Sequence, residues 1–284
     1  MSGISRALYR YGRDPLSVAL LLAVWLAAGI TFAALAFLLL YILAQGLPHL
    51  NLALFAAEYT TENVSLLPAL ADTVIMVALA LLFATPLGIF AAIYLVEYAK
   101  RGSRVVSAVR VTADTLSGIP SIVYGLFGML FFVITLRLGY SLLSGACTAA
   151  IMILPLVMRT TEEALRAVPD SYREGSFGLG ASKLRTIFAI VLPAAVPGIL
   201  AGVILGMGRI VGETAALIYT SGTVAALPQN VLSSGRTLAV HMYVLASEGL
   251  YMPQAYATAV VLVLIVIMIN ALANYLGRRL MKGR

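Results

Sequence analysis

The chain has 284 residues, of which 61% are hydrophobic and only 11% are charged. Soluble domains carry about 25% charged residues, so this composition excludes an ordinary water-soluble enzyme or binding module. The formal net charge of +7 could indicate nucleic-acid binding, a reading that the distribution of the basic residues can test. The single cysteine, Cys147, excludes an internal disulfide and has no partner for a metal site.

Six uncharged stretches are long enough to cross a membrane, because a helix needs about 20 apolar residues to span the hydrocarbon layer. A seventh, residues 214–235, contains turn-forming residues after Tyr219, so its beginning is predicted to finish the preceding helix. The first contains the apolar run 18–43, which is too long for a signal peptide and is predicted to remain as an anchor. The chain is therefore predicted to be an all-α polytopic membrane protein with six spans, at 15–57, 73–96, 115–136, 138–158, 186–208 and 249–277.

Sixteen of the nineteen basic residues precede the first span or lie in every second connection after it. Arg6, Arg10 and Arg13 begin this pattern. Cytoplasmic loops collect Lys and Arg, so both termini are predicted to face the cytoplasm and no nucleic-acid partner is expected. The remaining connections face outward and are expected to expose His49 and His241 in loops or interfaces. A short helix at 238–245 and a plain loop both fit the apolar pattern there.

The inner connection at about 159–188 has a distinctive local pattern. Asp170 and Ser171 follow Pro169 as a helix-start signal, and Glu174 lies in or near the first turn, where the helix dipole favours a carboxylate. Gly178 and Gly180 are expected to end that short helix. Small residues allow close backbone approach, so the pattern predicts a projecting helix-turn-helix that a partner protein could seat in a groove.

This connection resembles the signature loop of binding-protein-dependent ABC importer permeases, which reads Glu-Ala-Ala, three residues, Gly, nine residues, Ile-x-Leu-Pro. Here Glu174-Gly175-Ser176 is followed at the same spacings by Gly180 and by Ile190-Val-Leu-Pro193, with two small residues in place of the alanines. In that family the loop docks on the ATPase. The resemblance implies that the ATPase contacts are made by Glu174, Gly175, Ser176, Gly180, Ala181 and Ser182.

The sequence contains no Gly-Lys pair, which a P-loop requires. No cofactor is therefore expected in this chain, and ATP and Mg²⁺ are expected to bind separate subunits.

The fifth span carries two charged residues, Arg209 and Glu213. Their spacing of four places them on one helix face, where an ion pair is expected. An arginine near the centre of a membrane costs about 2.5–3.5 kcal/mol, and its planar fork of donors suits tetrahedral oxyanions. A substrate path and a purely structural ion pair both remain possible. The glycines at 198, 202 and 206 are expected to form a seam for close helix packing.

The string Arg209-Ile-Val-Gly-Glu213-Thr214-Ala resembles a segment of the A-type permeases of bacterial phosphate-specific ABC importers, as does Ser117–Gly125. The resemblance implies a type I importer permease fold with a phosphate path lined by Arg209, Glu213 and Thr214. It also implies alternating access in the bacterial cytoplasmic (inner) membrane, among its lipids. The implied partners are a C-type permease, two ATP-binding subunits and a periplasmic phosphate-binding protein.

The expected organisation is an N-terminus, peripheral helix and first outer loop at 1–66, a permease core at 67–278 and a basic tail at 279–284. Pro86, Pro120 and Pro155 are expected to kink the core helices. Three alternatives remain: a permease for sulfate or molybdate, a secondary transporter, and an intramembrane enzyme. A secondary transporter would often show an internal repeat, and a hydrolase would need a nucleophile with a nearby base; neither is evident in the sequence.

Overall fold

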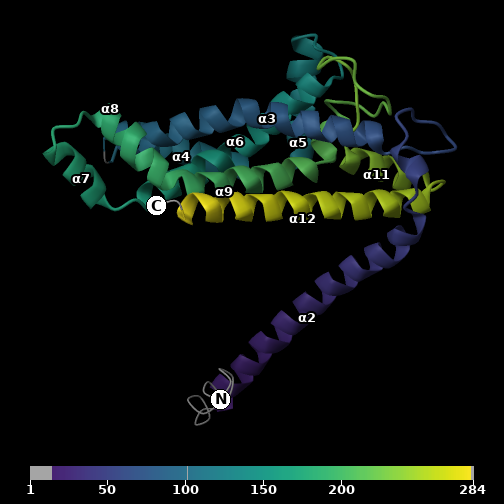
Figure 1. Ribbon diagram of the computed structural model, residues 1–284, viewed down its shortest axis with the longest axis horizontal. Helices are drawn as coiled ribbons and strands as arrows, with labels where there is room; N and C mark the ends of the chain where they lie inside the picture. Colours follow the sequence, from purple (N-terminus) through teal and green to yellow (C-terminus); the bar gives the residue numbers. More distant parts are fainter. Residues whose placement is uncertain (1–14, 101, 283–284) are drawn as a thin grey trace.

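The computed structural model describes residues 15–100 and 102–282, and the elements within those ranges are helices and loops. Four long helices lie side by side as a bundle: α3 (Leu67–Ile93), α6 (Leu142–Arg166), α9 (Leu192–Val211) and α12 (Met252–Lys282) (Figure 1). The predicted all-α fold is confirmed. The N-terminal arginines Arg6, Arg10 and Arg13, together with Arg101 and residues 283–284 of the predicted tail, lie outside the described residues.

Five of the predicted spans are continuous helical segments, and the third is bent. The continuous segments are Leu16–His49, Leu67–Tyr98, Leu142–Arg166, Lys183–Val211 and Met252–Leu272. In place of a straight helix at 115–136, α4 (Arg104–Ser117) meets the helical segment Ser121–Thr135 at 101°. That segment consists of α5 (Ser121–Gly128) and a π-helical continuation, η4 (Met129–Thr135). Pro120 causes the break because it lacks an N–H and disfavours a helical conformation in the preceding residue.

Close packing of α6 against α3 and α9 organises the bundle. A Cβ atom on Gly88 of α3 would lie 2.9 Å from Cγ1 of Val157, and one on Gly198 of α9 would lie 2.6 Å from Cβ of Ala164. Gly202 lies against Thr160 in the same way. Small residues let helix backbones approach closely in a membrane, where hydrophobic burial does not drive association. The predicted glycine seam on α9 is confirmed, and α6 is its partner.

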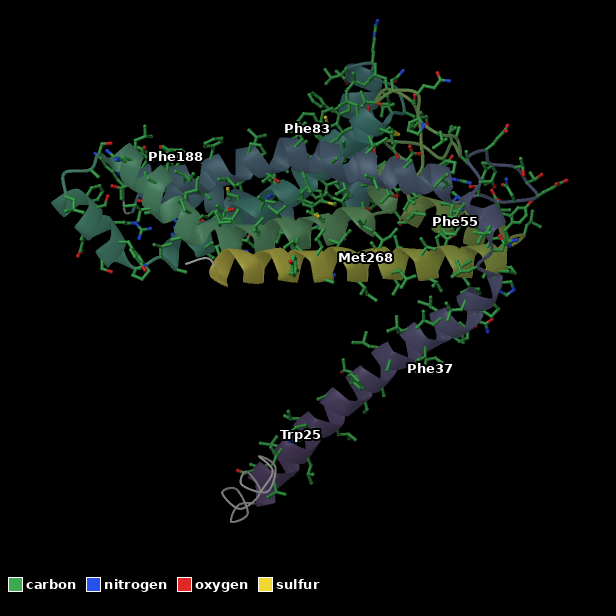
Figure 2. All side chains as sticks on the ribbon, viewed as in Figure 1. Trp25, Phe37, Phe55, Phe83, Phe188 and Met268 are labelled. Carbon is green, nitrogen blue, oxygen red and sulfur yellow. The ribbon has the colours of Figure 1, made fainter. Side chains whose placement is uncertain are left out.

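Helix α2 (Pro15–Gly46) runs away from the bundle, as Figure 1 shows. Its labelled residues Trp25 and Phe37 lie along the free part of the helix (Figure 2), and they are 56% and 67% exposed. The helix joins the bundle at one end, where Tyr41 meets Tyr256 of α12 edge to face with ring centres 6.0 Å apart. A helix that is apolar on all sides suits a lipid environment, in agreement with a peripheral membrane helix.

The two ends of the bundle carry different elements. One end carries α7 (Asp170–Gly178) and α8 (Lys183–Thr186), followed by the π-helical stretch η5 (Ile187–Val191). The opposite end carries α11 (Leu238–Glu248), so residues 238–245 form a helix and not a plain loop.

The prediction of an exposed His241 is wrong. His241 is completely buried in α11, with its ring 6.2 Å from that of Tyr59. Burial, assisted by the positive charge of Arg236, lowers the pKa of His241 to about 3, so the imidazole is neutral. The buried Asp72 of α3 also lies in this region, against Gly235.

The glycine seam can be tested with one substitution and a matched control on the same helix. Gly202→Ala is expected to destabilise the protein by about 1–3 kcal/mol, because the added methyl group would overlap Thr160. Gly208→Ala is the control, because a Cβ atom there meets nothing within 4 Å. Thermal unfolding of the two purified variants measures the difference. Equal melting temperatures would show that close approach of α9 to α6 at Gly202 does not contribute to stability.

Candidate functional site

Helix α7 has the limits that the sequence predicts, and its end is shaped by Gly180. The N–H of Ala181 donates to the carbonyl of Ser176 at 3.1 Å, and the N–H of Gly180 donates to that of Phe177 at 2.9 Å. These two bonds form a Schellman motif, which needs a left-handed residue after the helix. Gly180 supplies it with φ of +79°. The chain then turns back into α8, whose first turn is capped by Ser182.

The structure exposes only part of the residue set that was predicted to contact an ATPase. Glu174, Gly175 and Gly180 are exposed, whereas Ser176 is buried and its Oγ lies 2.8 Å from Oγ1 of Thr186 in α8. Ser176 therefore fixes the turn between the helices. Sequence reasoning missed large exposed side chains beside this residue set, although apolar residues next to glycines in a charged loop could have indicated them: Tyr172 at 55%, Phe177 at 47% and Leu179 at 91% exposure.

The residues predicted for the substrate path lie at a break in the bundle. Helix α9 ends at Val211, and the short helix α10 (Ala215–Ile218) begins after three non-helical residues. The prediction that residues 215–219 finish the preceding helix is therefore wrong. Gly212 follows the last helical residue, and a glycine there favours helix termination.

Arg209 and Glu213 do not form the expected ion pair; within the described part of the chain, no ion pair joins them. Arg209 lies in the last turn of α9 and is half-buried. Glu213 lies beyond the helix end and is only 8% exposed, with Oε1 accepting a hydrogen bond from the N–H of Ala216 at 3.0 Å. The carboxylate thus caps the start of α10. The four-residue spacing does not produce an ion pair, because α9 ends between Arg209 and Glu213.

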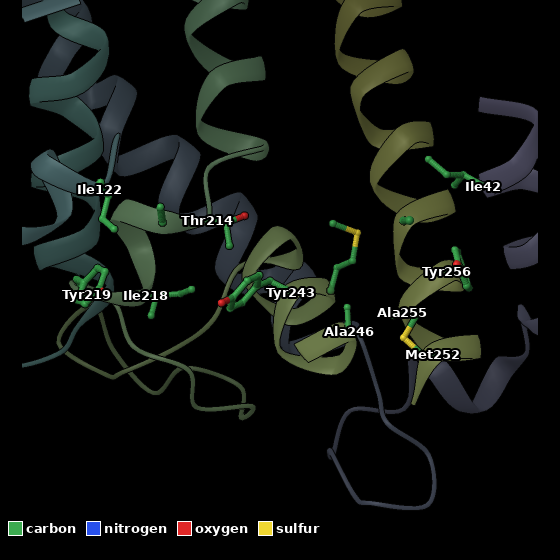
Figure 3. Close-up of a pocket in the computed structure, with 13 residues that line it drawn as sticks. Ile42, Ile122, Thr214, Ile218, Tyr219, Tyr243, Ala246, Met252, Ala255 and Tyr256 are labelled. Carbon is green, nitrogen blue, oxygen red and sulfur yellow. The ribbon is translucent and has the colours of Figure 1, made fainter. Parts of the chain in front are cut away.

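Thr214 faces an apolar cavity of about 610 Å³, which Figure 3 shows between α5, α10, α11 and α12. Tyr219 and Tyr243 also line it, and its other walls are mostly aliphatic. Arg209 and Glu213 are not among the lining residues. The cavity is therefore unsuited to hold an ion by itself, and the three predicted path residues lie close in sequence without lining one chamber.

The bent helix connects this break to the α7 end of the molecule. The hydroxyl of Tyr124 in α5 donates to the carbonyl of Leu116 in α4 at 2.7 Å, across the 101° bend. Gly125 lets α5 lie directly on α10, because a Cβ atom there would be 2.8 Å from Cα of Ala216.

Two ion pairs attach helix α4 to α6. Helix α4 supplies the arginine in one pair and the aspartate in the other. Arg110 Nη2 lies 2.6 Å from Oε1 of Glu162, and Asp114 Oδ1 lies 2.7 Å from Nη2 of Arg159. Arg166 adds a second arginine to Glu162 at 2.7 Å. These residues line a polar cavity of about 230 Å³. Sequence reasoning had used the three arginines only as a topology signal and had given Asp114 and Glu162 no role.

Comparison with known proteins agrees with this geometry. A family model described as "Binding-protein-dependent transport system inner membrane component" matches residues 84–282, which is most of the chain. Together with five or six segments long and apolar enough to cross a membrane, this match makes the chain a multi-pass permease subunit of an ABC importer. The chain belongs to the binding-protein-dependent transport family.

Several named permease proteins are similar to this chain in sequence. The chain is 32% identical over 281 residues to the probable ABC transporter permease protein YqgI of Bacillus subtilis, with 90% of this chain and 93% of that protein covered. It is 34% identical over 244 residues to the phosphate transport system permease protein PstA of Pasteurella multocida, covering 84% and 86%. PstA 1 of Mycobacterium tuberculosis is 43% identical over 155 residues, covering 54% and 50%.

Solved structures share the fold. A bacterial alginate ABC transporter superposes with a TM-score of 0.68 at 18% identity, covering 98% of this chain and 99% of that one. The MetNI methionine ABC transporter, in an inward facing conformation, gives 0.58 at 19% identity, covering 76% and 94%. At these identities the likeness concerns the fold alone.

The shape of the turn between α7 and α8 depends on the left-handed backbone at Gly180. Gly180→Val is expected to distort the turn because a β-branched residue is strained at φ of +79°, even though the surrounding space is open. The measurement is co-purification of the ATP-binding subunits with the permease, which should fall for this variant. Gly178→Ala, a helical position with equally open space, is the control and should bind normally. Undiminished association of the Gly180→Val variant would contradict the assigned role of the turn.

Proposed function

We propose that this chain is the permease subunit of an ATP-driven importer that moves inorganic phosphate across the bacterial cytoplasmic membrane. The observation that carries the proposal is the position of Arg209. This half-buried arginine lies in the last turn of a membrane helix, just before three non-helical residues. A guanidinium group presents a rigid fork of donors that fits a tetrahedral oxyanion. The relatives named as phosphate transport permeases support the choice of phosphate.

The proposed path needs a second permease chain. The large cavity of this chain is mostly apolar, and Arg209 lies outside it. An anion would therefore pass along a surface that includes Arg209 and is closed by a C-type permease subunit. Glu213 holds the break open by capping α10 and offers its second oxygen to a protonated phosphate oxygen. Thr214, next along the chain, lies on the wall of the neighbouring apolar cavity and is proposed to border the path.

The energy source is proposed to lie in two separate ATP-binding subunits, which hold ATP and Mg²⁺ and dock on α7. In this arrangement α7 and both termini face the cytoplasm, and α11 faces the periplasm, where a phosphate-binding protein delivers its ligand. Docking of the ATPases would move α7, and the path would open alternately to the two sides. The exposed Tyr172, Phe177 and Leu179 beside Glu174 group large apolar side chains on one short loop, and grouped exposed apolar surface fits a protein interface.

Phosphate uptake in vesicles containing all partner chains tests the proposed substrate site. Arg209→Ala is expected to reduce uptake by about tenfold or more, because a hydrogen bond to a charged group contributes about 1.5–3 kcal/mol. Arg209→Lys should retain part of the activity, since the charge remains but the fork is lost. Wild-type uptake by the alanine variant, at equal amounts of assembled complex, would overturn the assignment of Arg209.

A second substitution tests how the transporter selects phosphate over sulfate. Sulfate at neutral pH has no proton to donate to Glu213, and the carboxylate repels it. Glu213→Gln keeps an oxygen that can cap Ala216 and removes the negative charge, so sulfate should begin to compete with phosphate uptake. An unchanged preference in this variant would show that Glu213 does not select the anion.

A further inference from the structure

Arg173 of α7 is held by five hydrogen bonds on the side of the helix that faces the bundle. Its Nε and Nη2 donate to Oε1 of Glu97 at 3.1 and 2.8 Å. Its Nη1 donates to the carbonyl of Val168 at 2.8 Å and to Oδ1 of Asp170 at 3.2 Å. Nη2 also donates to the carbonyl of Leu165 at 2.9 Å. The side chains of Arg173 and Glu97 are only 14% and 9% exposed, so salt screens this pair less than a surface pair.

The bonding partners of Arg173 belong to three separate parts of the molecule. Glu97 lies in η3 (Tyr94–Tyr98), the π-helical continuation of α3. Leu165 lies in the last turn of α6, Val168 follows that helix, and Asp170 begins α7. Carbonyl groups at a helix C-terminus lack partners within the helix, and a cation there also interacts favourably with the helix dipole. One side chain therefore joins α7 to the ends of both α3 and α6.

Within the described residues, the other polar side-chain contacts of α7 and α8 are single interactions. Ser176 bonds to Thr186 of α8, which continues through η5 into α9, so this one bond joins α7 to the α9 segment. The Nζ of Lys183 in α8 lies 4.8 Å from the ring centre of Tyr98, and both residues are exposed. A cation–π contact of that kind contributes about 0.5–1 kcal/mol. A lysine could not replace Arg173, since it is a point charge without the planar fork.

We propose that Arg173 is a positioning residue that makes α7 move as one body with α3 and α6. This inference rests on the proposed function, in which the ATP-binding subunits dock on α7. A displacement of α7 is then carried into α6, and from α6 to α4 through the ion pairs of Glu162 and Arg159. Tyr124 carries it across the bend to α5, which lies on α10 beside the proposed path.

The test uses the complete complex, with both permeases, the ATP-binding subunits and the binding protein, reconstituted in lipid. Arg173→Lys keeps the charge and removes the fork, and Glu97→Gln keeps an acceptor and removes the ion pair. Arg104→Lys, at an exposed position at the start of α4, is the control. Two quantities are measured: the phosphate transported per ATP hydrolysed, and the mobility of a spin label at Ser171→Cys in a Cys147→Ala background.

Arg173→Lys is expected to assemble and hydrolyse ATP, with phosphate transported per ATP reduced by about fivefold or more and with a more mobile label. Glu97→Gln should show a smaller change in the same direction. The double variant should be no worse than Arg173→Lys alone, because the two residues share one interaction.

An assembled Arg173→Lys complex with the wild-type ratio and label mobility would overturn the inference. If that variant fails to assemble, a Glu97→Gln complex with wild-type values would overturn it equally, because Arg173 would then serve assembly alone. A wild-type complex that hydrolyses ATP without moving phosphate would refute the proposed function. In that case label mobility still decides the role of Arg173.

Discussion

The arrangement of this protein depends on how closely α6 packs against α3 and α9. At three glycines, Gly88, Gly198 and Gly202, the backbone of a neighbouring helix lies directly on side chains of α6, where a single methyl group would not fit. Protein interiors transmit displacement because they are densely packed and nearly incompressible. Since α6 leads into α7 at one end and α9 leads into the Arg209 break at the other, this packing sets the relation between the two functional regions.

The interruption after α9 keeps backbone groups paired within the protein: the N–H of Gly212 donates to the carbonyl of Gly208 at 3.2 Å, and that of Glu213 donates to the carbonyl of Ile210 at 3.1 Å. In a bilayer, non-helical backbone is tolerated only where other protein groups or a cavity accommodate it. Glu213 caps the N–H of Ala216, and the hydroxyl of Thr220 donates to the carbonyl of the same residue at 2.8 Å. Ser221 makes the equivalent bond to Leu217 at 3.0 Å. The segment is therefore an interruption that the surrounding side chains support, placed where an arginine ends the helix.

The sequence predicted the features that depend on local rules. Apolar run length identified the spans, Asp170 and Gly180 bracketed α7, and the four-residue glycine spacing identified the seam. Features that depend on distant partners were missed. The bend at Pro120 depends on the packing of α4 against α6 and of α5 against α10. The burial of His241 depends on the outer loop that carries Tyr59. Arg173 was treated as a topology charge, because its partner Glu97 lies 76 residues away in the chain.

The central claim is that α6 and α9 form one rigid unit, which joins α7, the proposed docking helix for the ATPase, to the proposed substrate path. A disulfide between Ile153→Cys and Gly206→Cys, in a Cys147→Ala background, tests it most directly. A Cβ atom on Gly206 would lie 3.9 Å from that of Ile153, within the range that a disulfide accepts. Phosphate uptake by the reconstituted complex, measured before and after oxidation, should be unchanged when the bond forms. Uptake that is lost on oxidation and restored on reduction would show that the two helices move relative to each other, and would contradict this account.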